Sequence, residues 1–574
     1  MERKKKGKRA WLATFLSLTC FMIFTSIAYS PAFAQPVPGG TLIPTNIPKY
    51  VQPLVIPPEM PKSVAGGTPA ADYNIAVRQF QQQILPGGIW GATFPGPNGT
   101  TIPGMPATTI WSYGRAEDVI PPTGFIAPVP LTTGVSFNYP ALTIENTSGV
   151  ATKVRWINDL KDPTTGNFFP HLFLVDQSVM WANPPTANCI MGPPNATDCR
   201  TNILAPYTGP VPLVTHVHGA HVQAHSDGYP FAWFLPGATN IPAGYSLRGS
   251  HYTQADNTNA VAGSAFYAYE NTQAAATIWY HDHTMGMTRL NVYAGPAGFW
   301  LIRGGANDTA AGILPGPAPV GLGDPNFNAA YRGTIREIPI AIQDRSFNLD
   351  GTLFYPADRN FFDGFTGPYI GNTGFTLPYA AGPPPTGPSD IHGIWNPEAF
   401  FNTIVVNGTT WPKFDVAQAR YRFRLLNGCN SRTLNLSMFV VTGVGLDGVF
   451  GTADDVLDPL QEVPFYQIGG DQGFLPKVVK IQKGFATILP GNGTIPPLTP
   501  AADPAQALLM LGAERADVIV DFSLIANGTR IRIINTADDA PFGGFPNVPA
   551  DSLTSGQVMD FIVNNPLNLP ADLT

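Results

Sequence analysis

Proline and glycine interrupt this chain at short intervals, and this limits what it can fold into. The sequence holds 60 Pro and 59 Gly among its 574 residues, and only 12% of its residues are charged. Proline and glycine both disfavour helix interiors, so short strands joined by turns are favoured over long helices. No long amphipathic helix is evident. The pattern predicts an all-β fold of Greek-key β-sandwich domains with long Pro/Gly-rich loops.

The apolar runs that could form strands are short and are separated by turn residues. In the first half of the chain the predicted strands are residues 50–56, 73–83, 211–222, 274–283 and 298–303, with a pair within 142–158 around a turn at Ser148-Gly149. In the second half they are residues 335–344, 401–406, 421–427, 465–469, 516–522 and 558–563. A Gly/Ala/Pro-rich linker at 305–330 divides the chain into two expected domains, 35–304 and 331–574.

Residues 1–34 are predicted to be a secretory signal peptide. Six basic residues lie within the first nine positions, an apolar run follows from Ala10 to Ile27, and Ala32-Phe33-Ala34 forms a cleavage signal. The apolar run is long enough to span a membrane, so a membrane anchor is the alternative. There is no Arg-Arg pair, which favours the Sec route. We therefore expect export to the periplasm, the cell surface or the extracellular space.

Charge and cysteine content narrow the possible partners. Cleavage would remove six basic residues and Glu2, which changes the net charge from −7 to about −12 and argues against nucleic acid or an anionic membrane as partner. In an exported protein, Cys189 and Cys199, which flank a Pro/Asn-rich loop, are predicted to form a disulfide. Cys429 has no histidine nearby in the sequence and is predicted to be a buried free thiol.

Two His-x-His triplets are the candidate metal ligands: His216 and His218 in THVHGAH, and His281 and His283 in WYHDHTMGM. Side chains two positions apart on a strand point to the same face, roughly 6–7 Å apart. That spacing is wide for one metal ion and comfortable for two neighbouring ions. Two such strands side by side would present four imidazoles to a metal cluster. Imidazole binds copper, zinc, iron and nickel, so the spacing alone does not identify the metal.

The residues around these triplets resemble the multicopper oxidase family. The resemblance lies in HVHG at 216–219, SDGYPFAWF at 226–234 and WYHDHTMGMTRLNVYAGPAGFWLI at 279–302, and in the second half in VNGTTWPKFDV at 406–416, YRFRLLNGCNSRTLNLS at 421–437 and GAERADVIVDF at 512–522. It extends from about Tyr50 to Asn564 and is strongest to the bacterial laccase and bilirubin-oxidase branch, which includes spore-coat laccases. It implies tandem cupredoxin-like domains.

The resemblance also implies copper chemistry. In that family a type 1 copper takes electrons from a reducing substrate and passes them to a trinuclear cluster, held by eight histidines, which reduces O2 to water. By motif position, His216 corresponds to a ligand of the type 2 copper, and His218, His281 and His283 to ligands of type 3 coppers. Asp227 stands where the family has an acidic residue near the cluster that helps to deliver protons. The family's reducing substrates include phenols, tetrapyrroles and metal ions.

Other residues near the triplets have less specific interpretations. Asp227 precedes a glycine and could simply form a turn. Met285 and Met287 are expected to pack in the core. The histidines at 221, 225 and 251 are expected to be solvated or hydrogen-bonded, with a copper relay as the alternative. The Asp-rich stretch 443–458 could bind Ca²⁺, but a solvated acidic turn is the favoured interpretation. Residues 355–392 form an insert that is expected to cap a surface.

Half of the family's ligand set is not found in these 574 residues. A third cupredoxin domain would carry an HPxHxH motif and an HCHxxxHxxxxM motif, whereas the last histidine here is His392 and the last cysteine Cys429. The sequence therefore predicts half of a trinuclear site and no type 1 site. Three interpretations stay open: a truncated or split oxidase whose third domain comes from a separate chain, a non-catalytic copper-binding or interaction protein derived from the family, and a two-domain scaffold that trimerises.

Overall fold

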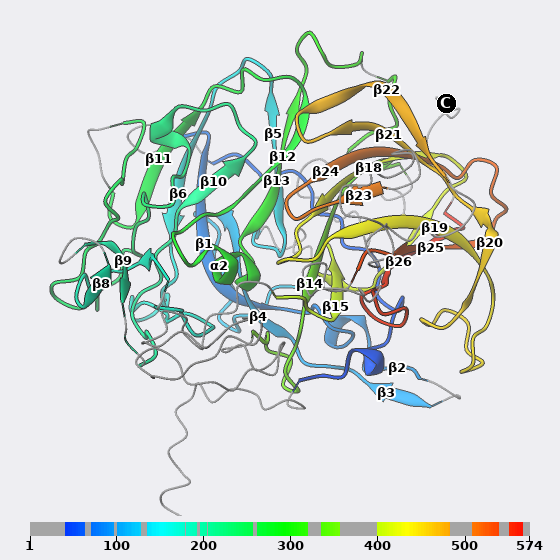
Figure 1. Ribbon diagram of the computed structural model, residues 1–574, viewed down its shortest axis with the longest axis horizontal. Coiled ribbons are helices and arrows are strands. Elements are labelled where there is room, and N and C mark those ends of the chain that lie inside the picture. Colours follow the sequence, from blue (N-terminus) through cyan, green and yellow to red (C-terminus); the bar gives the residue numbers. More distant parts are fainter. Residues whose placement is uncertain are drawn as a thin grey trace, which may run out of the picture. The chain divides into compact units, whose positions relative to one another are not determined.

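Strands account for nearly all of the regular structure. The computed structural model describes residues 41–63, 71–96, 100–127, 135–177, 179–191, 196–201, 203, 205–256, 261–310, 312–318, 334–355, 399–482, 508–538 and 550–565. Within these residues, helix is limited to α2 (Thr288–Ala294) and three single 3-10 turns, η1 (Pro44–Asn46), η2 (Gly88–Trp90) and η5 (Ala224–Ser226). The predicted all-β fold class is confirmed (Figure 1). None of the described helices is long and apolar enough to cross a membrane.

The first half of the chain forms two four-stranded sheets, with strand orders β11-β6-β1-β4 and β10-β12-β13-β5. Their strands are β1 (Tyr73–Gln82), β4 (Thr108–Arg115), β5 (Ala141–Thr147), β6 (Thr152–Asn158), β10 (Thr215–His218), β11 (Ser264–Tyr269), β12 (Ala276–Asp282) and β13 (Ala297–Arg303). β1 with β6 and β13 with β5 are parallel pairs, and the other neighbours are antiparallel. The chain changes sheet at the predicted Ser148-Gly149 turn, between β5 and β6.

Aromatic side chains fill the space between these two sheets. Tyr113 on β4 and Trp156 on β6 contact Tyr280 on β12, with ring centroids 5.0 and 5.5 Å from that of Tyr280. All three rings are almost completely buried. Because alternate residues of a strand point to opposite faces, the packing of Tyr280 into this core directs Trp279 and His281 to the other face of β12. The core therefore sets the direction of the second histidine triplet.

The second half forms a seven-stranded sheet, β16-β15-β14-β18-β24-β21-β22, and a six-stranded sheet, β17-β26-β25-β19-β20, in which β23 also pairs with β19. Their strands are β14 (Glu337–Arg345), β15 (Thr403–Val406), β16 (Thr409–Thr410), β17 (Lys413–Val416), β18 (Arg420–Asn427), β19 (Leu434–Gly443), β20 (Val456–Glu462), β21 (Phe465–Gly470), β22 (Gly473–Ile481), β23 (Leu508–Met510), β24 (Arg515–Asp521), β25 (Arg530–Asn535) and β26 (Gln557–Val563). Phe423 and Phe561 stack between the two sheets with centroids 5.2 Å apart.

Most predicted strands are present, and the differences have local causes. The strand predicted over 211–222 is reduced to the four residues of β10. Proline at 210 and 212 cannot donate to a ladder, which limits the pairing before β10. Residues 50–56 make only an isolated bridge between Pro53 and Lys413. In the four large sheets, the strands that were not predicted are β4, β11, β16, β17, β19, β20, β22, β23 and β25.

The described strands of the first two sheets come from residues 73–303, and those of the last two from residues 337–563. The exact boundaries of the predicted domains stay a prediction, and residues 38–574 form one compact unit. The predicted signal peptide, half of the predicted linker and almost all of the 355–392 insert lie outside the described residues.

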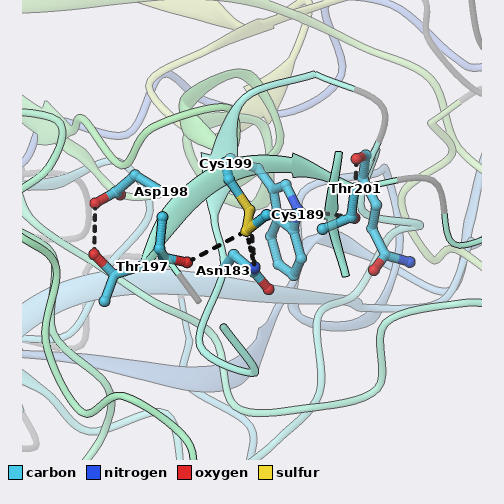
Figure 2. Close-up of a disulfide and its surroundings, with 9 residues drawn as sticks. Asn183, Cys189, Thr197, Asp198, Cys199 and Thr201 are labelled. Atoms are coloured by element: carbon cyan, nitrogen blue, oxygen red, sulfur yellow. Dashed lines mark hydrogen bonds between the residues drawn. A yellow bond between two sulfur atoms is a disulfide. The ribbon is translucent and has the colours of Figure 1, made fainter. Parts of the chain in front are cut away.

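Two smaller sheets are also present. β2 (Thr93–Pro95) and β3 (Thr101–Pro103) form a hairpin. β7 (Trp181–Ala182), β9 (Asp198–Thr201) and β8 (Cys189–Met191) form a small three-stranded sheet. The predicted Cys189–Cys199 disulfide is present in this sheet, and Figure 2 shows Asn183 beside it, with Nδ2 3.2 Å from Cys199 Sγ. Cys429 is free and buried, as predicted.

The Asp-rich stretch 443–458 uses its carboxylates within the loop. Asp454 Oδ2 accepts a hydrogen bond from the Asp447 backbone N–H, and Asp455 Oδ2 accepts from Gly451 N–H and Thr452 N–H. No group of three or more His, Cys, Asp or Glu side chains that could hold one metal ion is found among the described residues. These contacts agree with an acidic turn, but Asp455 is not solvated as expected, because it is buried and pairs with Arg532 on β25.

Candidate metal centre

The two predicted His triplets lie on neighbouring strands. β10 pairs with β12 in antiparallel register, with His216 opposite His281 and His218 opposite Trp279. Val217, between the first two histidines, is buried on the other face of β10. His283 follows the last residue of β12, and its backbone N–H donates to Val214 O at 2.8 Å. The register places all four imidazoles on one side of the strand pair.

The four rings are mutual neighbours. Ring centroids are 5.9 Å apart for His216 and His218, and 5.6 Å apart for His281 and His283. Across the strands the centroid of His216 lies 5.7 Å from that of His281 and 5.1 Å from that of His283. His281 Nε2 lies 3.4 Å from His218 Nδ1. The structure thus brings the predicted residues together, although no three of the described side chains make a single-ion site by themselves.

Backbone carbonyls orient two of the rings. His216 Nδ1 lies 2.5 Å from Asp227 O, and His281 Nδ1 lies 2.7 Å from Asp282 O. A carbonyl oxygen only accepts hydrogen bonds, so each Nδ1 carries the proton and each Nε2 keeps a free lone pair. This is the arrangement that prepares a histidine to bind a metal ion through Nε2.

Burial favours the neutral form of three of the rings, those of His218, His281 and His283. Burial, Arg515 and then His216 lower the pKa of His218 to about 4. Burial and then His216 lower the pKa of His281 well below its ordinary value, and the same two causes lower the pKa of His283. Neutral imidazole is the form that binds metals. The donor set therefore fits a first-row transition metal that accepts several imidazoles, and copper is such a metal.

Asp227 lies at the edge of the site. It follows η5, and its Oδ1 lies 3.4 Å from His216 Nδ1, with 41% of its side chain exposed. The hydrogen bond from His216 lowers the pKa of Asp227 against the opposing effect of burial. The loop approaches β10 closely because Gly228 has φ +72°, and a Cβ there would lie 2.1 Å from Thr215 O. An ionised, partly exposed carboxylate thus stands beside the first triplet.

A buried network supports the second triplet. Asp282 accepts hydrogen bonds from the backbone N–H of Val214 and Thr284, from the Thr284 hydroxyl and from Asn291 Nδ2 on α2. Asn291 Oδ1 also lies 2.9 Å from His171 Nε2. Neither His171 nor Asn291 was predicted from the sequence to support the site. The one available signal was the position of Asp282 between two candidate ligands.

Trp279 is a further residue that sequence reasoning missed. Its ring centroid is 4.1 Å from that of His281 and 5.5 Å from that of His218, with interplanar angles of 30° and 28°. The ring thus packs against one histidine from each triplet. Trp279 also lines a cavity of about 440 Å³ with His218, His281 and His283, and residues 427–430 and 512–513 of the second half line it as well. The buried thiol of Cys429 lies in that wall.

The remaining candidates do not join the four imidazoles. Met287 is completely buried, as predicted. His225 Nδ1 lies 2.7 Å from Ser226 Oγ, and His251 Nδ1 lies 3.0 Å from Ser250 Oγ. The backbone N–H of His221, an exposed residue, donates to Gln273. These contacts agree with the expectation of solvated or hydrogen-bonded histidines.

No family model matches the chain. Comparisons with individual known proteins find laccases and multicopper oxidases. A laccase from Bacillus stratosphericus is 32% identical over 361 residues, which cover 62% of this chain and 48% of that protein. A laccase from Haloferax volcanii is 27% identical over 91% of this chain and 59% of its own length. Multicopper oxidase LPR1 homolog 1 from Oryza sativa is 28% identical over 80% of this chain and 52% of its own length.

The chain spans about half the length of the curated relatives it matches. Among solved structures, a multi-copper oxidase from Pediococcus acidilactici is similar over 91% of this chain and 63% of that chain, with 18% identity and a TM-score of 0.44.

Proposed function

Because the chain belongs to the multicopper oxidase family, we propose that His216, His218, His281 and His283 hold copper as one half of a trinuclear site. The observation that supports this most directly is the convergence of four imidazoles on two paired strands. In such an oxidoreductase, bound copper would couple the oxidation of a phenolic, tetrapyrrole or metal-ion substrate to the reduction of O2 to water.

Each ligand takes the role of its motif position. His216 would bind the type 2 copper, and His218, His281 and His283 would bind type 3 coppers. The backbone carbonyls of Asp227 and Asp282 hold the Nδ1 protons of His216 and His281 and leave each Nε2 free. These carbonyls fix the ring orientations before any metal arrives, which lowers the cost of binding.

Asp227 moves protons in this proposal. Reduction of one O2 to water consumes four protons, and a positioned carboxylate can carry them. Its side chain is 41% exposed and lies 3.4 Å from the His216 ring. It can therefore exchange protons with solvent on one side and face the metal site on the other.

The remaining ligands lie outside these 574 residues. His392 is the last histidine and Cys429 the last cysteine, so the sequence holds no His-Cys-His motif for a type 1 copper. We propose that a further cupredoxin domain supplies them, either from a separate chain or from a continuation of this one. A neighbouring reading frame, or the DNA that follows the Thr574 codon, should encode HCHxxxHxxxxM.

The second candidate function is a non-catalytic copper-binding or interaction protein. It requires only the four imidazoles that the paired strands bring together. It predicts copper uptake at the two triplets without any coding sequence for the missing motif. A trimeric scaffold would differ from both by its defined oligomeric state. In every case we propose that the protein is exported by the Sec route and acts at the periplasm, cell surface or outside the cell.

Copper loading of the purified chain tests the proposal. We expect copper uptake that falls sharply in the His281→Ala/His283→Ala double variant. We also expect no intense blue absorption, because that colour needs a cysteine ligand of the type 1 kind. The absence of copper uptake would contradict the proposed site. Strong blue colour together with turnover of a phenolic dye by this chain alone would contradict the half-site proposal.

A further inference from the structure

Residues of the second half of the chain reach the strand pair that carries the candidate ligands. Arg515, at the start of β24, donates from Nε to Thr277 O at 3.0 Å. Thr277 lies on β12, two residues before Trp279, and is buried. Arg424 on β18 donates to the hydroxyl of the same threonine at 2.7 Å. Two guanidinium groups therefore fix one point of β12 from outside its own sheet.

A second contact fixes the end of β10. Gly219 directly follows His218, and its carbonyl oxygen accepts hydrogen bonds from Gln472 Nε2 at 3.2 Å and from Gln273 Nε2 at 2.8 Å. Gln472 lies in the turn between β21 and β22, in the second half of the chain. One glutamine from each half of the chain thus donates to the same carbonyl oxygen, that of Gly219. This residue directly follows the candidate ligand His218.

Gly219 makes this approach possible. Its φ is +91°, and a Cβ at this position would lie 3.0 Å from Arg515 Nη2 and 3.1 Å from Gln472 Nε2. Any side chain there would have to displace one or both donors. The glycine therefore serves the contact between the halves as well as the turn itself.

Arg515 has no freedom to leave this position. Its side chain is 2% exposed. Besides Thr277 O, it donates to Ala513 O at 2.7 Å and to Asp471 O at 3.0 Å. Three carbonyls in different directions match the fork of a guanidinium, which a single ammonium group cannot reproduce. The guanidinium thus holds β12 and the β21–β22 turn, which carries Gln472, at a set separation.

We propose that Arg515 and Gln472 position His218 for metal binding by clamping the ends of β10 and β12 across the two halves of the chain. They are positioning residues and do not themselves touch the metal. The proposal rests on the proposed function, because it assigns them a role only if His218 binds copper. Partners that orient metal ligands typically change metal affinity by 10–100-fold when they are removed.

Two variants test the clamp. Gln472→Ala removes an exposed side chain, so we expect little effect on the thermal midpoint of the metal-free chain. Arg515→Lys keeps the positive charge but removes the planar guanidinium group that donates to three carbonyl oxygens. For each we expect about a tenfold loss of Cu(I) affinity, measured by competition with a chromophoric chelator. We also expect a changed electron paramagnetic resonance spectrum after Cu(II) loading, because the His218 ring is displaced.

Matched controls separate positioning from general stability. Gln482→Ala removes another exposed glutamine whose amide donates to a backbone carbonyl, that of Glu462. Arg532→Lys alters a guanidinium with a 0% exposed side chain that is paired with Asp560 and Asp455. Both controls should keep wild-type copper affinity, even though Arg532→Lys lowers the thermal midpoint.

The outcomes are distinguishable. Wild-type copper affinity and an unchanged spectrum in both test variants would overturn the clamp and leave the proposed function intact. The clamp would also be overturned if copper affinity falls in parallel with the thermal midpoint across all four variants. Arg515 and Gln472 would then act only through the overall stability of the chain. If the unaltered chain takes up no copper, the proposed function fails and the clamp fails with it.

Discussion

At the scale of single residues, the second triplet depends on the aspartate between its histidines. Asp282 is completely buried, and burial raises its pKa to about 6, although four donors favour the ionised form. Each carboxylate oxygen accepts two hydrogen bonds. Oδ1 accepts from Val214 N–H and the Thr284 hydroxyl, and Oδ2 accepts from Thr284 N–H and from Asn291 Nδ2 on α2. Asp282 therefore ties the strand that carries His281 to the residues before β10 and to the helix.

Replacing Asp282 by asparagine should destabilise the metal-free chain. The amide NH2 would replace one oxygen and face two donors, which leaves buried groups without partners at a cost of about 2–3 kcal/mol. Urea unfolding of the metal-free protein measures this loss. Asp458→Asn is the control, because Asp458 accepts its hydrogen bonds at an exposed position. Equal unfolding free energies for the two variants would contradict the role given to Asp282.

The sequence identified the four histidines and Asp227 but not the residues that support them. Spacing predicts that His216 and His218 share a face, because strand geometry is local. The same geometry places Trp279 on the face of His281. Nothing local indicates that Trp279 also contacts His218 on the paired strand, or that Asn291 donates to Asp282 from a helix. Local geometry could therefore predict that the candidate ligands share a face, and long-range pairing determines their surroundings.

At the scale of elements, the loop that carries Asp227 lies against β10 at Gly228. This glycine has φ +72°, and a Cβ added to it would lie only 2.1 Å from Thr215 O. The contact leaves no room for a side chain. The distance between the loop and His216 is thus set by one glycine.

Gly228→Ala should separate the loop from β10 and weaken metal binding. Alanine at positive φ costs about 1 kcal/mol, and the collision with Thr215 adds to this cost. Gly149→Ala is a matched control, because Gly149 has φ +76° and no neighbour within 4 Å of an added Cβ. We expect the larger loss of unfolding free energy, and a loss of copper affinity, only for Gly228→Ala. Identical behaviour of the two variants would show that the close approach is unimportant.

The disulfide between β8 and β9 closes a short loop, with ten positions separating Cys189 and Cys199. By the loop-entropy relation, such a cross-link stabilises the fold by about 3 kcal/mol. The Cys189→Ala/Cys199→Ala double variant should lose about this much in urea unfolding. Added reductant should lower the stability of the unaltered chain and leave that of the double variant unchanged. If reductant affects both equally, the stabilisation does not come from this disulfide.

At the scale of the whole molecule, buried charges join the two halves. Arg303 on β13 pairs with Glu145 on β5 and with Glu337 on β14. Arg424 on β18 pairs with the same Glu337 at 2.6 Å. Trp279, Phe299 and Leu301 pack beside this network against Ala341 and Leu426 of the second half. The candidate ligands therefore lie on strands that the second half holds through both charged and apolar contacts.

Glu337 makes this interface sensitive to acid. Burial would raise its pKa, but Arg424, Arg303 and Arg422 together outweigh burial and lower the pKa from 4.5 to about 2. A lowered pKa means that the ionised form stabilises the folded chain above pH 4.5, and that this contribution is lost as the pH falls from 4.5 towards 2. A shift of this size corresponds to about 3 kcal/mol.

The unfolding free energy should therefore fall steeply between pH 4.5 and pH 2. Glu337→Gln should be less stable at neutral pH and should show a flatter pH dependence in this window. Glu117→Gln, at an exposed position, should keep the unaltered profile. Parallel profiles for the unaltered chain and Glu337→Gln would show that this carboxylate does not carry the acid response.

The sequence predicted two sandwich-like halves but could not predict how they meet. The Pro and Gly positions and the lengths of the apolar runs predict the fold class. They also predict both ends of β1, β12 and β18 to within two residues. The partners of Glu337 come from β13 and β18, which are distant from each other in sequence, and charges at such positions carry no signature of pairing. The contact of Arg515 with Thr277 also joins residues that are distant in sequence, and it could not be predicted for the same reason.

The four converging imidazoles should bind copper together, and every role given above to their neighbours depends on this. X-ray absorption at the copper edge, with copper-to-protein ratios, tests it most directly on the unaltered chain, the His216→Ala/His218→Ala/His281→Ala/His283→Ala variant and a variant with alanine at His221, His225 and His251. We expect copper in an imidazole environment for the unaltered chain and the triple variant, and loss of that copper in the quadruple variant. Equal copper content and an equal imidazole signal in the quadruple variant would contradict this claim.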